Sequence, residues 1–98
     1  MQINSLPLVL IKWDDIVTES AGWFPLEVID DLTHQNCFSV GWLVKEDSLN
    51  YYVIQTFGEH KGVWEGSGDI TIPKGCVRAI KILLNENWMG SVATELIH

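Results

Sequence analysis

The chain has 98 residues, enough for one domain, and 47% of them are hydrophobic, including five tryptophans. This composition predicts a packed core and excludes an intrinsically disordered chain. Six basic residues against thirteen acidic ones leave a net charge of −7, which argues against nonspecific binding to nucleic acid and against an anionic membrane surface.

The sequence shows no signal for export or membrane insertion. No apolar stretch approaches the roughly 20 residues that cross a bilayer. The apolar run at residues 6–11 ends at Lys12 and lacks the basic leader and small-residue cleavage site of a signal peptide. We therefore expect a cytoplasmic protein in which Cys37 and Cys76 are reduced thiols.

Alternating residues predict a first strand over residues 8–13 and then a hairpin. One face of this strand carries Val9, Ile11 and Trp13, and the other carries Leu8, Leu10 and Lys12. Because both faces are largely apolar, we expect both to be covered, one of them by another copy of the chain. Residues 37–58 predict two strands joined by a turn at 46–50, where turn-forming residues gather.

The second half of the chain predicts a loop and two further strands. Residues 58–68 contain four glycines and are predicted to form a loop. Strands are predicted at 69–72 and 77–84, with a tight turn between them that contains Pro73 and Gly75.

One short helix is predicted at residues 25–32, because Pro25 suits a first helical turn and apolar residues follow near helical spacing. Roughly four to six short strands with one short helix predict an all-β domain over residues 1–84. We expect it to close into a small barrel, because closure removes exposed sheet edges. Residues 85–98 are predicted to be a C-terminal tail.

Catalytic and metal-binding motifs are weak in this sequence. His34 and Cys37 have the spacing of a ligand pair, and His60 and Cys76 would complete four ligands, but no second paired motif exists. The glycine-rich segment contains Lys61 without the Gly-Lys-Ser/Thr of a phosphate loop. We therefore expect no metal, no cofactor and no catalytic residues.

Aromatic and basic residues are the strongest candidates for a binding site. Trp64 lies in the predicted loop, where a large indole needs either an apolar cluster or a partner, and Trp42 lies in a predicted strand. Stacking on these rings, with phosphate contacts from nearby cations, is how a nucleotide-like ligand would be held. The candidate ligand-binding residues are Arg78, Lys74, Lys81, Trp42 and Trp64. Packing at a barrel end or in a subunit interface is the alternative role for each tryptophan.

Two strings resemble small phage and prophage proteins of unassigned role: CFSVGWLVKED at 37–47 and ITIPKGCV at 70–77. The resemblance covers roughly residues 8–84, and Trp23 matches a tryptophan that often precedes a short helix in those proteins. It implies a small SH3-like or Sm-like β-barrel and a phage origin. It carries no catalytic residues.

These expectations favour a non-enzymatic binding protein that forms a homo-oligomer. One function is direct inhibition of a host protein, for example a component of antiphage defence, with the acidic segment around Asp14 and Asp30 as the contact face. The alternative is an oligomeric sponge that sequesters a nucleotide-type immune signal. An enzymatic activity ranks third, and a virion or assembly role fourth. A phage origin would place the protein in the cytoplasm of a bacterial host.

Overall fold

The computed structural model describes residues 6–16, 23, 25–27 and 34–88. Its strands are β1 (Leu8–Ile16), β2 (His34–Glu46), β3 (Asn50–Ile54), β4 (Thr56–His60), β5 (Val63–Ser67), β6 (Ile70–Pro73) and β7 (Val77–Leu84). A single 3-10 turn, η3 (Lys74–Cys76), joins β6 to β7. The chain is therefore a small all-β fold, as the alternating sequence pattern predicts.

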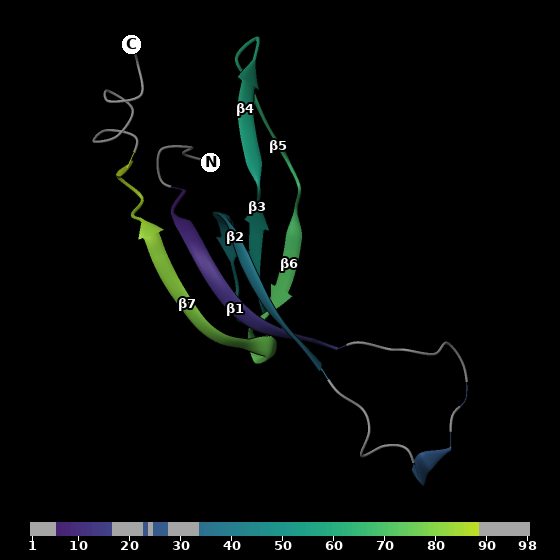
Figure 1. Ribbon diagram of the computed structural model, residues 1–98. Coiled ribbons are helices and arrows are strands. Elements are labelled where there is room, and N and C mark those ends of the chain that lie inside the picture. Colours follow the sequence, from purple (N-terminus) through teal and green to yellow (C-terminus); the bar gives the residue numbers. More distant parts are fainter. Residues whose placement is uncertain (1–5, 17–22, 24, 28–33, 89–98) are drawn as a thin grey trace.

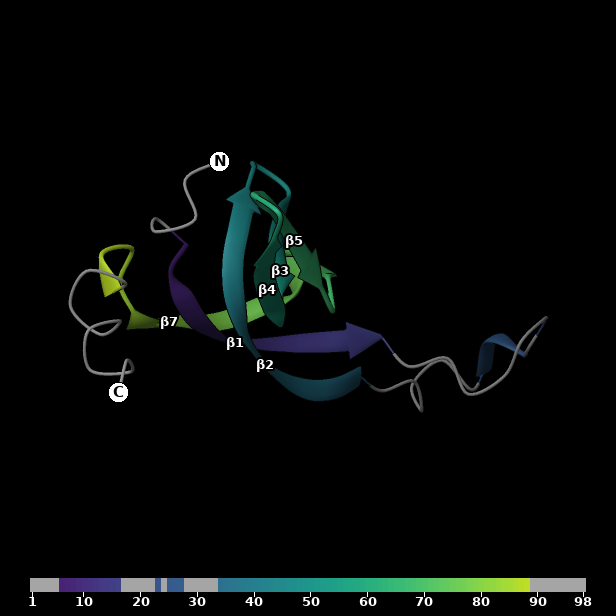
Figure 2. The same cartoon turned by 90° about the horizontal axis from the view of Figure 1, so that it is seen from above.

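Five strands form one antiparallel sheet in the order β6-β3-β2-β1-β7 (Figure 1). The remaining two, β4 and β5, pair only with each other. β4 continues the line of β3, and β5 leads back to β6, so the four strands form one long hairpin. We call its outer half the arm (Thr56–Ser67). The Gln55 amide donates to the Ser67 carbonyl and links the arm to the sheet. The C-terminal end of β1 and the N-terminal end of β2 leave the sheet as a two-stranded ribbon (Figure 2).

The core lies on the face of β1 that carries Val9 and Ile11. Both are buried, together with Val53 of β3 and Ile72 of β6, and Trp13 packs against them. The alternation in β1 predicted two largely apolar faces, and the structure shows that the face with Val9 and Ile11 is the one that forms the core. The Trp13 indole is also satisfied, because its Nε1–H donates to the Ser39 hydroxyl on β2 at 3.0 Å.

Strand β2 is able to serve two halves of the sheet because it passes close to β3 at Gly41. Its first part pairs with β1, and its last part pairs with β3. A Cβ at Gly41 would stand 2.7 Å from the Ile54 carbonyl oxygen and in contact with Val53 Cγ1. Only glycine permits this close approach.

The predicted loop at 58–68 is wrong, because most of it forms β4 and β5. Lys61 and Gly62 have φ of 51° and 79°, the left-handed values that a two-residue hairpin turn requires. The glycines of this segment are typical of a loop, so the sequence pattern did not predict the two strands. Gly66 lies against the Ile54 side chain, where a Cβ would meet Cδ1 at 3.0 Å. Since β5 is exposed along its length, it also lacks the apolar alternation of a half-buried strand.

The predicted barrel closure is also wrong, since β6 and β7 remain the two edges of an open sheet. β6 has only four residues and ends at Pro73, which has no N–H to donate. η3 then redirects the chain before β7 begins. As a result Ile80 and Ile82, which lie opposite Ile11 and Val9 on β1, are 40% and 62% exposed.

The other predicted elements have mixed outcomes. The hairpin is confirmed as β2 and β3, with a tighter turn than predicted, but its second strand ends at Ile54, and residues 56–58 belong to β4. The strands predicted at 69–72 and 77–84 correspond to β6 and β7. The helix predicted at 25–32 falls mostly outside the described residues. Leu26 and Glu27 take a 3-10 conformation.

Candidate functional site

Four aromatic side chains meet where the arm joins the sheet. The Trp42 ring of β2 contacts the Phe57 ring of β4 edge-on, with centroids 5.3 Å apart. Phe57 in turn contacts Trp64 of β5 at 5.9 Å, and Trp42 also packs on Trp88 at 4.8 Å. We call these four residues the aromatic cluster. It brings together Trp42 and Trp64, the two tryptophans that the sequence indicated as ligand-binding.

Trp88 ties the segment after β7 to the start of the chain. Its Nε1–H donates to the Leu6 carbonyl at 2.8 Å. Leu6 is itself buried, although it precedes β1. The hydrogen bond between Trp88 and Leu6 therefore holds the inner end of the aromatic cluster in place. Trp64, at its outer end, is 46% exposed.

A pocket of about 300 Å³ opens beside the outer part of this cluster. Its apolar lining comes from the sheet and the arm together: Leu6, Val44, Ile54, Phe57, Trp64 and Gly66. Gly66 contributes space rather than contact, because it has no side chain to fill the pocket beside Ile54. Apolar walls with a few polar groups are typical of a preformed binding site, and this volume lies at the small end of the range for ligand pockets.

The charges in the pocket lining are negative. Glu65 and Asp69 are its two charged members, and none of the lining residues is basic. Glu59, opposite Trp64 in the β4–β5 register, adds a second carboxylate to the arm beside Glu65. Aromatic ring faces also carry negative potential. The pocket therefore attracts cations and repels phosphates.

Arg78, the leading candidate for gripping a phosphate, lies elsewhere and has partners. Its Nε donates to Asp14 Oδ2 at 2.6 Å, and its Nη1 donates to the Gly75 carbonyl at 3.3 Å. Leu8 pairs with Trp42, and Asp14 lies six residues further along β1, which is about 20 Å in an extended strand. Arg78 and the aromatic cluster therefore belong to opposite ends of β1.

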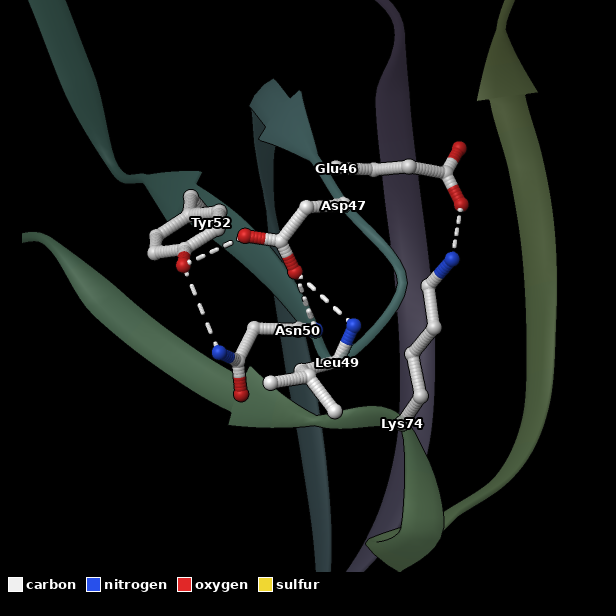
Figure 3. A network of polar contacts seen from close by, with 6 residues as sticks. All are labelled: Glu46, Asp47, Leu49, Asn50, Tyr52 and Lys74. Carbon is white, nitrogen blue, oxygen red and sulfur yellow. Dashed lines mark hydrogen bonds and ion pairs between the residues drawn. The ribbon is translucent and has the colours of Figure 1, made fainter.

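Lys74 belongs to a polar network at the β2–β3 turn (Figure 3). Its ammonium lies 2.6 Å from Glu46 Oε2 and 4.9 Å from the centroid of the Tyr51 ring. The ion pair with Glu46, more than any other contact, raises the pKa of Lys74 above its usual range. Glu46 therefore neutralises the charge of Lys74, and the ion pair holds the lysine side chain at this turn.

Asp47 organises the same turn. Its Oδ1 accepts the backbone amides of Leu49 and Asn50 at 2.9 and 2.8 Å, and its Oδ2 accepts the Tyr52 hydroxyl at 2.8 Å (Figure 3). These bonds, led by the one from the Leu49 amide, lower the pKa of the Asp47 carboxyl. These contacts account for the structure of the turn, and the Lys74 ammonium beside it is paired with Glu46.

Lys81, the last candidate, is exposed on β7 opposite Leu10 of β1. The structure thus brings Trp42 and Trp64 together through Phe57, and places Lys74, Arg78 and Lys81 at three other positions. The five residues do not form one site in the described part of the chain.

Sequence analysis missed Phe57, Trp88, Glu65 and Asp69 as members of the site. One signal for the first of these was present: Lys61-Gly62 is an acceptable hairpin turn, and pairing outward from it places Phe57 opposite Gly66 and Glu59 opposite Trp64. The partners of Trp88 could not be read from the sequence, because Leu6 and Trp42 both lie far from it along the chain.

Among the residues that the structure describes, no three His, Cys, Asp or Glu side chains gather as metal ligands would. Cys37 and Cys76 are free thiols, and the side chain of His34 lies outside the described part. Within the same residues, no helix has the length and apolar character needed to cross a bilayer. No family profile, curated protein or solved structure matches this chain.

Proposed function

We propose that this chain is a non-enzymatic binding protein that acts by covering a surface of another protein. The observation that carries the proposal is the pocket beside the aromatic cluster, formed jointly by the sheet and the arm and lined by Trp64, Glu65 and Asp69. Exposed aromatic residues in a small apolar pocket are typical anchors for a protein partner. The resemblance to phage and prophage proteins supports a bacterial host protein as that partner, with antiphage defence as its setting.

The alternative, an oligomeric sponge for a nucleotide-type signal, has weaker support. An anionic nucleotide would have to enter a pocket with two carboxylates and no basic lining residue, on a chain with a net charge of −7. The cations that would hold it, Lys74 and Arg78, are engaged by Glu46 and Asp14. We therefore rank protein binding above nucleotide binding.

Self-association is part of the proposal. Ile80, Ile82 and Leu83 are 40%, 62% and 41% exposed on β7, which is an edge strand. Exposed apolar edges invite pairing with another strand, and a second copy of the chain is always at hand.

The test is affinity capture from bacterial lysate with three matched baits: wild type, Trp64→Ala and Trp23→Ala. Trp23 is fully exposed and outside the aromatic cluster, so its replacement controls for the loss of an exposed indole. We expect a partner that the wild type and Trp23→Ala retain and Trp64→Ala loses. That partner, once purified, should bind the wild type directly in calorimetry, with an affinity at least tenfold weaker for Trp64→Ala.

Two results would overturn the proposal. One is a purified candidate that binds all three baits equally, because the pocket would then have no part in recognition. The other is saturable calorimetric heat from a member of a panel of cyclic and linear nucleotides, which would favour the sponge. Circular dichroism of Trp64→Ala must match the wild type for either comparison to count.

A further inference from the structure

The pocket beside the aromatic cluster has the features of a site for a flat cation. Its two aromatic walls, Phe57 and Trp64, are tilted by 53° and lie 5.9 Å apart between centroids, so they are in contact and leave no slot for a ring between them. Trp64 is 46% exposed and therefore offers ring surface to a partner. An indole is the best side chain for holding a cation over its face.

The charges select the kind of group that enters. Glu65 and Asp69 are the two charged lining residues, both acidic, and Glu59 lies opposite Trp64 across the β4–β5 pair. Lys61 is at the far tip of the arm, in the turn beyond His60 and Val63. A cation entering this pocket meets acidic residues and no basic group in the lining.

The apolar lining selects among cations. Leu6, Val44 and Ile54 line the pocket together with the aromatic rings, so an entering group exchanges part of its water for apolar contacts. A guanidinium is more weakly hydrated than an ammonium, stacks on aromatic faces and presents a planar fork to carboxylates. The volume of about 300 Å³ is at the small end for ligand pockets, which suits one long side chain.

We propose that the pocket receives an arginine side chain of the partner protein, with the guanidinium over Trp64 and its N–H groups toward Asp69. This inference rests on the proposed function and names the feature that the partner must present. Arginine is enriched at the centres of protein interfaces, where it pairs with buried aromatic anchors. The partner surface is therefore basic where it meets the arm.

The test uses capped tripeptides as probes, titrated into the full-length protein and followed by ¹H–¹⁵N NMR. Acetyl-Gly-Arg-Gly-amide should shift the Trp64 indole N–H and the Gly66 amide saturably. Its citrulline counterpart has nearly the same shape without the charge, and we expect its binding to be about tenfold weaker or more. The corresponding glutamate peptide should leave both signals in place.

Matched variants test the carboxylates. Glu65→Gln combined with Asp69→Asn should weaken binding of the arginine peptide by about tenfold. Asp15→Asn removes a single exposed acid on β1, away from the arm, and should leave the affinity unchanged. These substitutions keep the size of each side chain, so the fold is expected to survive, and the dispersion of the amide spectrum checks it.

Three results would overturn the arginine assignment: equal binding of the arginine and citrulline peptides, tighter binding of a lysine peptide, or tighter binding of free agmatine than of the peptide. The last would favour a small-molecule guanidinium over a protein. If a captured partner still depends on Trp64 while no arginine peptide binds, this inference fails and the proposed function stands. If the peptide binds but no Trp64-dependent partner exists, the proposed function fails by itself.

Discussion

At the scale of single residues, Lys61 is the clearest departure from local preference. It has a φ of 51° at the first position of the turn that joins β4 to β5, followed by Gly62 at 79°. A side chain in this left-handed conformation costs roughly 1–2 kcal/mol, and asparagine tolerates it best after glycine. The arm therefore carries a small strain at its tip.

Lys61→Asn is expected to stabilise the protein by a part of that cost, up to about 1 kcal/mol. Urea unfolding with an unchanged m-value provides the measurement. Lys61→Ala removes the same charge but keeps the unfavourable φ, so it should give no such gain. Equal gains from both variants would attribute the effect to charge instead of backbone conformation.

Asp47 makes stability depend on acid. Hydrogen bonds from the Leu49 and Asn50 amides and from Tyr52 hold the pKa of its carboxyl below the value in the unfolded chain. A lowered pKa in the folded state contributes stability that is fully present above the unfolded value of about 4 and is lost as pH falls through the folded value.

Asp47→Asn should therefore unfold at lower temperature than the wild type at pH 7, with the difference shrinking as pH falls from about 5 toward 2. Thermal melts over this pH range provide the comparison, and Asp15→Asn is the control with no such turn contacts among those described. A difference in melting temperature that stays constant with pH would show that shape, and not ionisation, accounts for the loss.

At the scale of elements, Gly41 decides how β2 is shared between β1 and β3. The position that its Cβ would take lies 2.7 Å from the backbone carbonyl oxygen of Ile54, which cannot move without disturbing the β2–β3 pair. This differs from Gly66, where the obstructing atom is the end of the Ile54 side chain.

Gly41→Ala is accordingly expected to lower the free energy of unfolding by about 1–3 kcal/mol, as other overpacked sites do. Gly66→Ala should cost less, because Ile54 can change its rotamer. Chemical denaturation of the two variants side by side provides the comparison. A smaller loss for Gly41→Ala than for Gly66→Ala would contradict the close approach of β2 and β3.

At the scale of the whole molecule, the open sheet and its small core are the main features. The described chain buries few large apolar side chains, and exposes others on β2, β7 and the arm, including Phe38, Val40 and Ile82. Exposed apolar surface of this extent in a protein of this size favours association.

We expect the wild type to be a homo-oligomer at micromolar concentration and Ile82→Asp to be a monomer, measured by light scattering on a size-exclusion column. Ile82 is 62% exposed, so a charge there leaves the folded chain intact while it opposes an apolar interface. Lys81→Asp, on the opposite side of the same strand, is the matched control. A monomeric wild type at high micromolar concentration would exclude self-association.

The sequence by itself determined the strands whose side chains divide between a buried and an exposed face. In β1 the alternation predicted the strand and its two apolar faces, and the tertiary structure decided that the face with Val9 and Ile11 is buried. Turn chemistry likewise located the end of β2 and the start of β3, because Asp47 satisfies the backbone amides of the turn through purely local bonds.

Only the tertiary structure decided which residues meet. β4 and β5 have no buried face, so their pairing left no periodic pattern, and the glycines that permit it indicated a loop. Phe57, Trp42 and Trp88 come from three separate parts of the chain. Arg78 forms an ion pair with Asp14, sixty-four residues away, and this pairing has no signal in the local sequence. The prediction of a closed barrel was wrong for the same reason. Closure requires the two edge strands, β6 and β7, to pair with each other, and the local sequence does not show whether they can. Local sequence records burial and turns, whereas contacts between distant segments depend on the path of the whole chain.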